Sequence, residues 1–359
     1  MTHSSIDAFD TRLNPSPAAP EARDAVLADP GFGVHFTDHM ITVDWTSDRG
    51  WHNAQVRPFG ALTLLPGASA LQYAQQVFEG MKAYRHADGT IWTFRPDRNA
   101  ARLRSSADRF LLPAPDDELF LASLRALVAA DHSWVPNPEG EKSLYLRPYI
   151  IGTEQFLGVR PSQAVTYGVI ASPAGAFVSG GLQPADVWLS EDYARAAPGG
   201  TGEAKYGGNY AAGLGPYSEA KAHGCAQTLF LDAETRTWVE EFGGMNVMFV
   251  TNDGRLVTPE LSGTILHGIT RASILQIASE DLGLVVEERR VSIQEWRDRV
   301  ADGTFTEVFA RTAWRSASHL GGHSPQALQK TCLSRRPEGP RRCEQVPQTG
   351  RQAKISPGL

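Results

Sequence analysis

Residues 199–213 read GGTGEAKYGGNYAAG and place a single lysine, Lys205, between two clusters of glycines. Glycine lets the backbone approach a flat ligand closely, and a lysine in that setting can be the amine nucleophile that forms a Schiff base with a carbonyl cofactor. Because lysine side chains are usually exposed, this segment taken alone is more simply explained as a flexible loop with a surface lysine. The rest of the sequence decides between these two interpretations.

Strand-like and helical stretches alternate on both sides of this segment. The expected strands are 41–45, 90–96, 143–152, 165–173, 185–190, 226–231, 237–241, 245–251, 284–291 and 304–309. The expected helices are 97–110, with Asp97 as its N-cap, 117–132, 215–224, 269–281 and 292–300. The pattern predicts a mixed α/β (α+β) protein with four parts: a loosely ordered arm at 1–30, a smaller domain at 31–173, an interdomain loop rich in glycine and proline at 174–186, and a larger domain at 187–310.

Composition excludes several classes of protein. The chain has 359 residues and a net charge of −6, and this acidic balance argues against a nucleic-acid partner. Its three cysteines are irregularly spaced, so we expect neither a disulfide framework nor a metal site. No signal peptide and no stretch long enough to span a bilayer is recognisable, and we therefore expect a cytoplasmic protein without a membrane partner. The common nucleotide-binding, zinc-protease and α/β-hydrolase motifs are also missing.

The segment KYGGNYAAG at 205–213 resembles the Schiff-base segment of the branched-chain amino-acid aminotransferases, which are pyridoxal-phosphate (PLP) enzymes of fold type IV. Other stretches resemble that family in the same order, between about residue 31 and residue 310. They are VFEGMKAYRHADGTIWTFRPDRNAARLRSSADRF (77–110), SLYLRPYIIGTEQFLGV (143–159), WVEEFGGMNVMFV (238–250) and LVTPELSGTILHGITRASIL (256–275). The resemblance implies a two-domain fold-type-IV enzyme whose larger domain binds PLP.

The resemblance also implies how the cofactor is held. Lys205 would carry PLP and later move a proton between the substrate and the cofactor, and Tyr210 would donate a hydrogen bond to the phenolic oxygen of the cofactor. Glu241 would pair with the pyridine nitrogen, because an electron sink of this kind needs that nitrogen protonated. Arg95 suits the phosphate through its guanidinium fork. Taken one at a time, Glu241 would be an exposed glutamate at a strand end and Tyr210 an aromatic packing residue.

Further implied contacts concern the phosphate and the substrate. Ile269 and Thr270 open a predicted helix whose N-terminal N–H groups would bind the phosphate, although Thr270 alone would be an ordinary N-cap. Phe78 and Tyr145 would form an apolar pocket for a branched side chain, or simply pack in the core. Arg147 would meet the second carboxylate of glutamate or 2-oxoglutarate, with a structural salt bridge as the alternative.

The resemblance implies an enzyme that transfers the amino group of L-leucine, L-isoleucine or L-valine to 2-oxoglutarate through a PLP Schiff base. It also implies a homodimer, because members of the family complete their substrate site across a dimer interface. A D-amino-acid aminotransferase and an aminodeoxychorismate lyase share the fold and remain alternatives. An inactive remnant is the alternative of a different class.

The resemblance stops after residue 310. Residues 1–310 hold 25 basic and 38 acidic residues, whereas 311–359 hold 9 basic and 2 acidic residues with only six Leu, Ile, Val or Phe. The family continues here into a Cys-Gly-Thr-Ala-Ala type of turn with a threonine for the phosphate, but this chain reads TEVFARTAWRSASHL. We therefore expect an incomplete second domain followed by a disordered basic tail, explained either by a shifted reading frame or by a genuine lineage-specific tail. Poor folding or weak PLP binding would follow.

Overall fold

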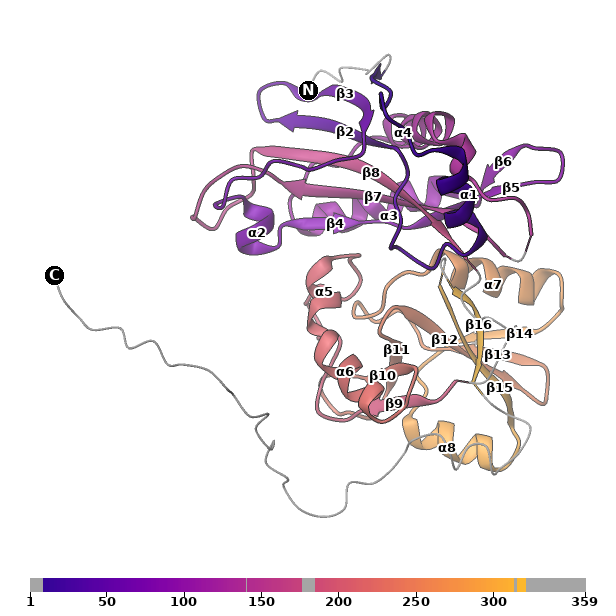
Figure 1. Ribbon diagram of the computed structural model, residues 1–359. Coiled ribbons are helices and arrows are strands. Elements are labelled where there is room, and N and C mark those ends of the chain that lie inside the picture. The colour runs from indigo at the N-terminus through magenta and orange to yellow at the C-terminus, as the bar shows by residue number, and fades with distance from the viewer. Residues whose placement is uncertain (1–8, 140, 176–184, 313–314, 321–359) are drawn as a thin grey trace, which may run out of the picture.

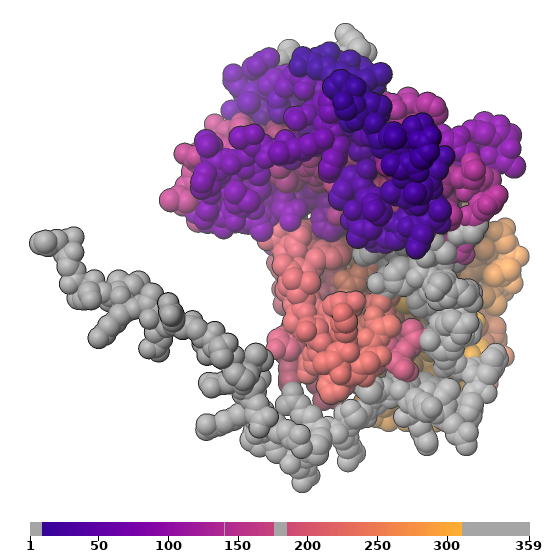
Figure 2. All heavy atoms as spheres, viewed as in Figure 1, coloured from indigo at the N-terminus to yellow at the C-terminus, as the bar shows by residue number. Residues whose placement is uncertain are grey.

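Two domains, each built around its own β-sheet, make up the part of the chain that the computed structural model describes, which is 9–139, 141–175, 185–312 and 315–320. Figure 1 shows the domain formed by the N-terminal half lying against the domain formed by the C-terminal half. In Figure 2 the indigo-to-magenta surface of the first domain rests directly on the salmon segment and the orange elements of the second. The mixed two-domain fold expected from the sequence is therefore confirmed.

The smaller domain has a largely antiparallel sheet in the order β1-β3-β2-β8-β7-β5-β6, with β4 paired to β7. Its strands are β1 (Asp10–Thr11), β2 (His39–Thr46), β3 (Gly50–Pro58), β4 (Gln76–Phe78), β5 (Met81–Arg85), β6 (Ile91–Thr93), β7 (Ser143–Gly152) and β8 (Ala164–Ala174). Its helices are α1 (Pro20–Ala28), α2 (Ser69–Tyr73), α3 (Pro96–Arg109), α4 (Asp117–Ala130) and the 3₁₀ turn η1 (His132–Trp134). Helices α3 and α4 bury apolar faces against this sheet, with Phe120 and Leu127 fully inside.

The larger domain has a mixed sheet in the order β14-β13-β12-β11-β10-β9, with β15 paired to β12 and β16 paired to β15. Its strands are β9 (Val187–Ser190), β10 (Gln227–Leu231), β11 (Val239–Phe242), β12 (Met245–Thr251), β13 (Arg255–Thr258), β14 (Val285–Glu288), β15 (Phe305–Thr312) and β16 (Arg315–Leu320). Its helices are α5 (Gly207–Ala212), α6 (Leu214–Ala222), α7 (Ile269–Glu280) and α8 (Ile293–Ala301). Strands β10, β11 and β12 are almost completely buried, which explains the runs of apolar residues in β10 and β12. Strand β11 is buried as well, although it carries Glu240 and Glu241.

Strands β3, β4, β5 and β13 are not predicted from the sequence. In β3 the apolar residues that face the core, Ala54 and Val56, are separated by polar ones, and the flanking residues are half-exposed. The expected N-cap of α3 is also wrong, because Arg95 caps the helix and Asp97 lies in its first turn. Short or mostly polar strands give too weak a periodicity to be recognised locally, since pairing partners stabilise them.

The expectation of a loose arm at 1–30 is wrong from residue 9 onward. Backbone N–H groups of the arm donate to side chains of the smaller domain: Asn14 N to His39 Nε2 (2.8 Å) and Ala18 N to Asp38 Oδ1 (2.8 Å). These bonds join residues twenty or more positions apart, so local composition does not reveal them. Residues 1–8 lie outside the described part of the chain.

The C-terminal tail is described only in part. Strand β15 continues to Thr312, past the end of the family resemblance, and β16 pairs with it in an antiparallel register. A strand at 315–320 departs from the disorder expected from residue 311. The expected interdomain loop falls largely on 176–184, which, like 321–359, lies outside the described residues, and the predictions for these segments stay predictions.

Candidate active site

Lys205 is buried at the junction of the two domains, and the interpretation as a surface lysine is therefore excluded. The residue is only 5% exposed, and it lies at the start of α5. Its backbone is held from the smaller domain: Lys205 N donates to Ser106 Oγ (2.9 Å), and its carbonyl accepts from Phe78 N (3.0 Å). Its Nζ donates to Tyr210 Oη at 3.0 Å, one turn into the helix. The structure thus brings Lys205, Tyr210 and Phe78 together.

Glu241 is completely enclosed on β11 and is paired with a cation. Arg195 Nη1 lies 2.8 Å from Glu241 Oε1 and also donates to the carbonyls of Gly202 and Thr264. The N–H of Leu266 donates to the same carboxylate at 3.0 Å. Through these bonds Arg195 joins the segment just before Lys205, at Gly202, to the strand that carries Glu241. The expectation of an exposed strand-end glutamate is wrong.

Burial raises the pKa of the Glu241 carboxyl above its ordinary value, and Arg195 and the N–H of Leu266 oppose that shift only in part. The neighbouring Glu240 behaves similarly. Burial raises the pKa of Glu240, the hydrogen bond from Thr264 opposes the shift, and the adjacent Glu241 carboxylate adds to it. The charge of Arg195 opposes the rise in the pKa of both carboxyl groups, although its guanidinium is paired directly with Glu241.

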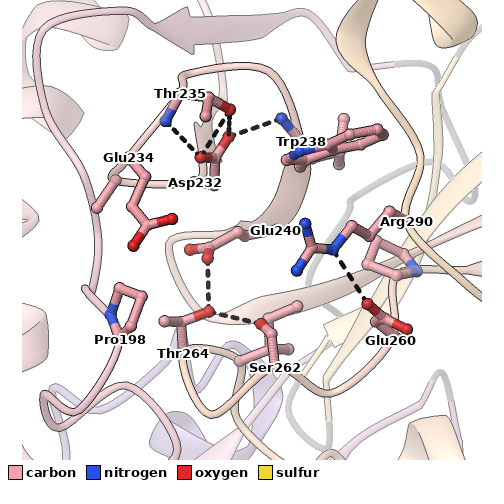
Figure 3. Close-up of a pocket in the computed structure, with 14 residues that line it drawn as sticks. Pro198, Asp232, Glu234, Thr235, Trp238, Glu240, Glu260, Ser262, Thr264 and Arg290 are labelled. Atoms are coloured by element: carbon pink, nitrogen blue, oxygen red, sulfur yellow. Dashed lines mark hydrogen bonds and ion pairs between the residues drawn. The ribbon is translucent and has the colours of Figure 1, made fainter.

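Glu240 faces away from Glu241, since successive residues of a strand point to opposite sides of a sheet. It lines a cavity of about 270 Å³ between the β10–β11 turn and the segment 259–265. Figure 3 shows the Glu240 carboxylate pointing into this cavity, with Thr264 donating to it at 2.5 Å and Arg290 held on the far wall by Glu260. This cavity lies on the other side of β11 from the Glu241 carboxylate.

Arg95 and the first turns of α7 meet across the domain boundary. Arg95 Nη1 donates to Ser273 Oγ at 2.6 Å, and Ser273 Oγ donates to the carbonyl of Ile269. Arg95 has a φ of 49°, a conformation uncommon for residues other than glycine, and such strain is often retained at functional sites. No side chain among the described residues caps α7, whose N-cap is Gly268. The guanidinium of Arg95 thus lies near the free N–H groups of Ile269 and Thr270.

Phe78, Tyr145 and Arg147 form one cluster on neighbouring strands β4 and β7. The guanidinium of Arg147 lies 4.7 Å from the Phe78 ring centre and 5.3 Å from that of Tyr145, and it donates to Tyr145 Oη at 3.2 Å. A Cβ at Gly80 would lie 1.8 Å from Tyr145 Oη, so only glycine permits this approach. Lys205 Nζ lies 5.0 Å from the same Phe78 ring, which places the cluster directly beside the lysine.

Arg147 is not part of a structural salt bridge. No carboxylate of the described residues lies within ion-pair distance of it, and its Nε is buried without a hydrogen-bond partner. Arg147 is partly buried, and a partly buried cation without an anion is costly unless a ligand supplies one. The arrangement therefore fits a site that receives a carboxylate.

Three charged residues at the junction are missed by sequence reasoning. Arg195 lies in a loop without periodicity, and nothing local indicates its pairing with Glu241. Glu79 and Arg102 lie within a stretch that resembles the aminotransferases, but their pairing joins separate elements, the β4–β5 turn and α3. Only information that relates positions far apart in the sequence would have predicted these ion pairs.

Glu240 provides a test of the electrostatic description. Its raised pKa means that its stabilising contribution is complete below its ordinary value of 4.5 and is lost as pH rises through the raised value. In Glu240→Gln this loss does not occur. We expect the unfolding free energy of the variant, relative to the wild type, to improve as pH rises above about 4.5 and to level off above the raised pKa of Glu240, measured by urea denaturation. The exposed Glu234→Gln in the same cavity is the matched control, and parallel pH profiles for Glu240→Gln and the wild type would contradict the description.

Comparisons with known proteins agree with this geometry. A family model described as amino-transferase class IV matches residues 76–311. The branched-chain-amino-acid aminotransferase of Mycolicibacterium smegmatis is 55% identical over 305 residues, which cover 84% of this chain and 83% of the relative. The solved branched-chain aminotransferase of Escherichia coli superposes with a TM-score of 0.65 at 26% identity, covering 79% of this chain and 85% of that chain.

A second solved structure, a T.th. branched-chain aminotransferase with pyridoxamine 5'-phosphate, has a TM-score of 0.63 at 26% identity and covers 80% of this chain and 90% of that chain. The expected cofactor, PLP, is thereby confirmed for the family. The family match ends at residue 311, where the predicted resemblance also ends. The chain belongs to the class IV aminotransferases, the PLP-dependent aminotransferases of fold type IV.

Proposed function

We propose that this protein transfers the amino group of L-leucine, L-isoleucine or L-valine to 2-oxoglutarate. One observation carries the proposal: the buried lysine lies beside a side-chain cluster that is apolar, through Phe78 and Tyr145, and cationic, through Arg147. A branched side chain requires the first property and the second carboxylate of 2-oxoglutarate requires the other. Relatives that are 52–55% identical and are named branched-chain-amino-acid aminotransferases, one of them as probable, support the assignment.

The residues at the domain junction fit PLP. Lys205 is the only described lysine that is buried, and it would hold the carbonyl carbon, while Tyr210 beside it would donate to the phenolic oxygen. Glu241 would pair with the ring nitrogen, and Arg95 with the N–H groups of Ile269 and Thr270 would take the phosphate. When bound, the cofactor supplies an electron sink for the bond that is broken at the substrate Cα.

Lys205 and its neighbours prepare the proton transfer. Tyr210 Oη holds Lys205 Nζ at 3.0 Å, which fixes the amine on one side of the pocket. The ring of Phe78 lies beside the amine, with 5.0 Å between Lys205 Nζ and the ring centre. The amine of Lys205 is therefore placed to take a proton from the substrate Cα and return it, the step that an aminotransferase needs at this position.

Arg147 would allow one site to accept two unlike substrates. Its guanidinium is stacked on two aromatic rings, so the planar cation adds an apolar face as well as hydrogen-bond donors. A leucine side chain would pack against that face and the rings. A second carboxylate would instead accept from the free donor edge.

We further propose a cytoplasmic homodimer. The segment 153–163 and helix α2 carry large apolar side chains that are strongly exposed in the single chain, with Val159 at 92%, Leu157 at 72% and Leu71 at 60%. A second copy of the chain would bury them. No helix of the described residues is long and apolar enough to cross a membrane.

Replacing Lys205 tests the central assignment. Lys205→Ala should lose aminotransferase activity with L-leucine and 2-oxoglutarate, and borohydride treatment of the PLP-loaded protein should no longer attach the cofactor covalently. Peptide mass spectrometry of the reduced wild type should find the cofactor on Lys205. Lys221→Ala, a lysine on the exposed side of α6, is the matched control and should change neither result. Covalent attachment at any other lysine would contradict the site.

Replacing Arg147 tests the substrate assignment. Arg147→Met keeps much of the volume of the side chain but removes the carboxylate partner, so the KM for 2-oxoglutarate should rise about 10- to 100-fold, the equivalent of one charge-assisted hydrogen bond. The half-reaction with L-leucine, followed by the absorbance of the cofactor, serves as the internal control and should change much less. Equal losses for both substrates would contradict the proposed role. Turnover of D-alanine, or release of pyruvate from aminodeoxychorismate, would instead identify one of the alternatives on this fold.

A further inference from the structure

One face of α3 makes a series of contacts with the larger domain. Arg102, Ser106 and Arg109 are separated by four and three positions, and such spacings place side chains on the same face of a helix, while Arg95 is the N-cap that precedes it. Arg95 contacts α7, and Ser106 accepts from Lys205 N. Arg109 donates to the carbonyls of Gly199 and Gly200, which lie a few residues before Lys205. The helix thus touches both segments that would hold the cofactor.

Arg102 is the most strongly held member of this series. Its Nε and Nη2 donate to the two oxygens of Glu79, at 2.7 and 2.9 Å, and its Nη1 donates across the boundary to the carbonyl of His267 at 3.1 Å. His267 directly precedes Gly268, the N-cap of α7. The position of Arg102 therefore affects the position of the N-terminus of α7.

Glu79 holds the guanidinium of Arg102 in a single orientation. Its side chain is completely buried, and it also accepts from Asn99 Nδ2 at 2.7 Å and from Gly80 N at 3.1 Å. Burial tends to raise the pKa of the Glu79 carboxyl, but the charge and hydrogen bonds of Arg102 outweigh it and lower the pKa below its ordinary value. The pair is thus ionised and fully hydrogen-bonded, and its planar bidentate geometry leaves little freedom.

A buried ion pair of this kind contributes little net stability compared with apolar residues of the same size, so its geometry is the more informative feature. Phe78, next to Glu79, covers Lys205, and His267, next to Gly268, leads into α7. The pair therefore joins the segment that carries Phe78 to the helix end where Arg95 and the free N–H groups meet.

We propose that Arg102 is a positioning residue, which, held by Glu79, sets the N-terminus of α7 at the correct place for the cofactor phosphate. The proposal rests on the proposed location of that phosphate at Arg95, Ile269 and Thr270. Arg102 itself touches the carbonyl of His267 and acts through the helix end.

The test compares two ligands of the apoenzyme, PLP and pyridoxal, which has the same ring without the phosphate. In Arg102→Lys the charge is kept but the bidentate bond to Glu79 and the bond to His267 cannot both be made. The Kd for PLP should rise about tenfold or more, while the Kd for pyridoxal should change less than about threefold. Glu79→Gln should show the same selective loss, because it weakens the hydrogen bonds that hold the guanidinium while the Arg102 residue itself is kept.

Arg98→Gln is the matched control, since Arg98 lies on the same helix, is exposed and pairs only with the exposed Asp97 among the described residues. It should leave both dissociation constants unchanged. A general disturbance of the fold by Arg102→Lys would weaken PLP and pyridoxal equally, and that result would overturn the proposal.

Arg95→Gln separates the proposal from the assignment on which it rests. If Arg95→Gln weakens PLP selectively but Arg102→Lys and Glu79→Gln do not, the phosphate site stands and the role of Arg102 is wrong. If none of the three variants distinguishes PLP from pyridoxal, the phosphate lies elsewhere and both statements are wrong. Aminotransferase activity of the wild type is measured in parallel and reports on the proposed reaction independently.

Discussion

The backbone of Lys205 is held by the smaller domain although the residue belongs to the larger one. Ser106 accepts from its N–H and Phe78 donates to its carbonyl, so the lysine is correctly placed only when the two domains are packed together. The wall of aromatic rings and Arg147 comes from the smaller domain, whereas Glu241 and α7 come from the larger one. The site is thus a property of the domain junction, which is where ligand sites are commonly found.

Charge at this junction is organised around three largely enclosed guanidinium groups with different roles. Arg195 is paired with Glu241, and Arg102 is paired with Glu79, so both are neutralised within the protein. Arg147 has no carboxylate partner among the described residues and remains available for one from a ligand. Since a partly buried charge without a partner is costly, the open guanidinium of Arg147 marks the place where an anionic substrate group would be bound, as Arg95 marks the proposed phosphate site.

Much of the fold follows from the sequence, and the reasons are physical. Long, largely buried strands such as β7 and β12 have mostly apolar sequences, and amphipathic helices such as α3 and α4 show clear periodicity. Short strands β4 and β5 depend on pairing with β7, which no local pattern encodes. The candidate site was placed largely by resemblance, and its residues do converge, whereas the pairs made by Arg195 and Arg102 join positions more than twenty residues apart and are visible only in three dimensions.

The most direct measurement is the absorption spectrum of the purified full-length chain at saturating PLP, followed through one half-reaction in each direction. The account predicts a visible band of lysine-bound cofactor that disappears on addition of L-leucine and returns on addition of 2-oxoglutarate, because the junction brings together Lys205, Glu241 and Arg147. Reaching saturation only at high PLP concentration would agree with the atypical sequence after residue 310, since a phosphate ligand is expected from that region. A band that does not respond to L-leucine at saturation, or no band at all, would contradict the account.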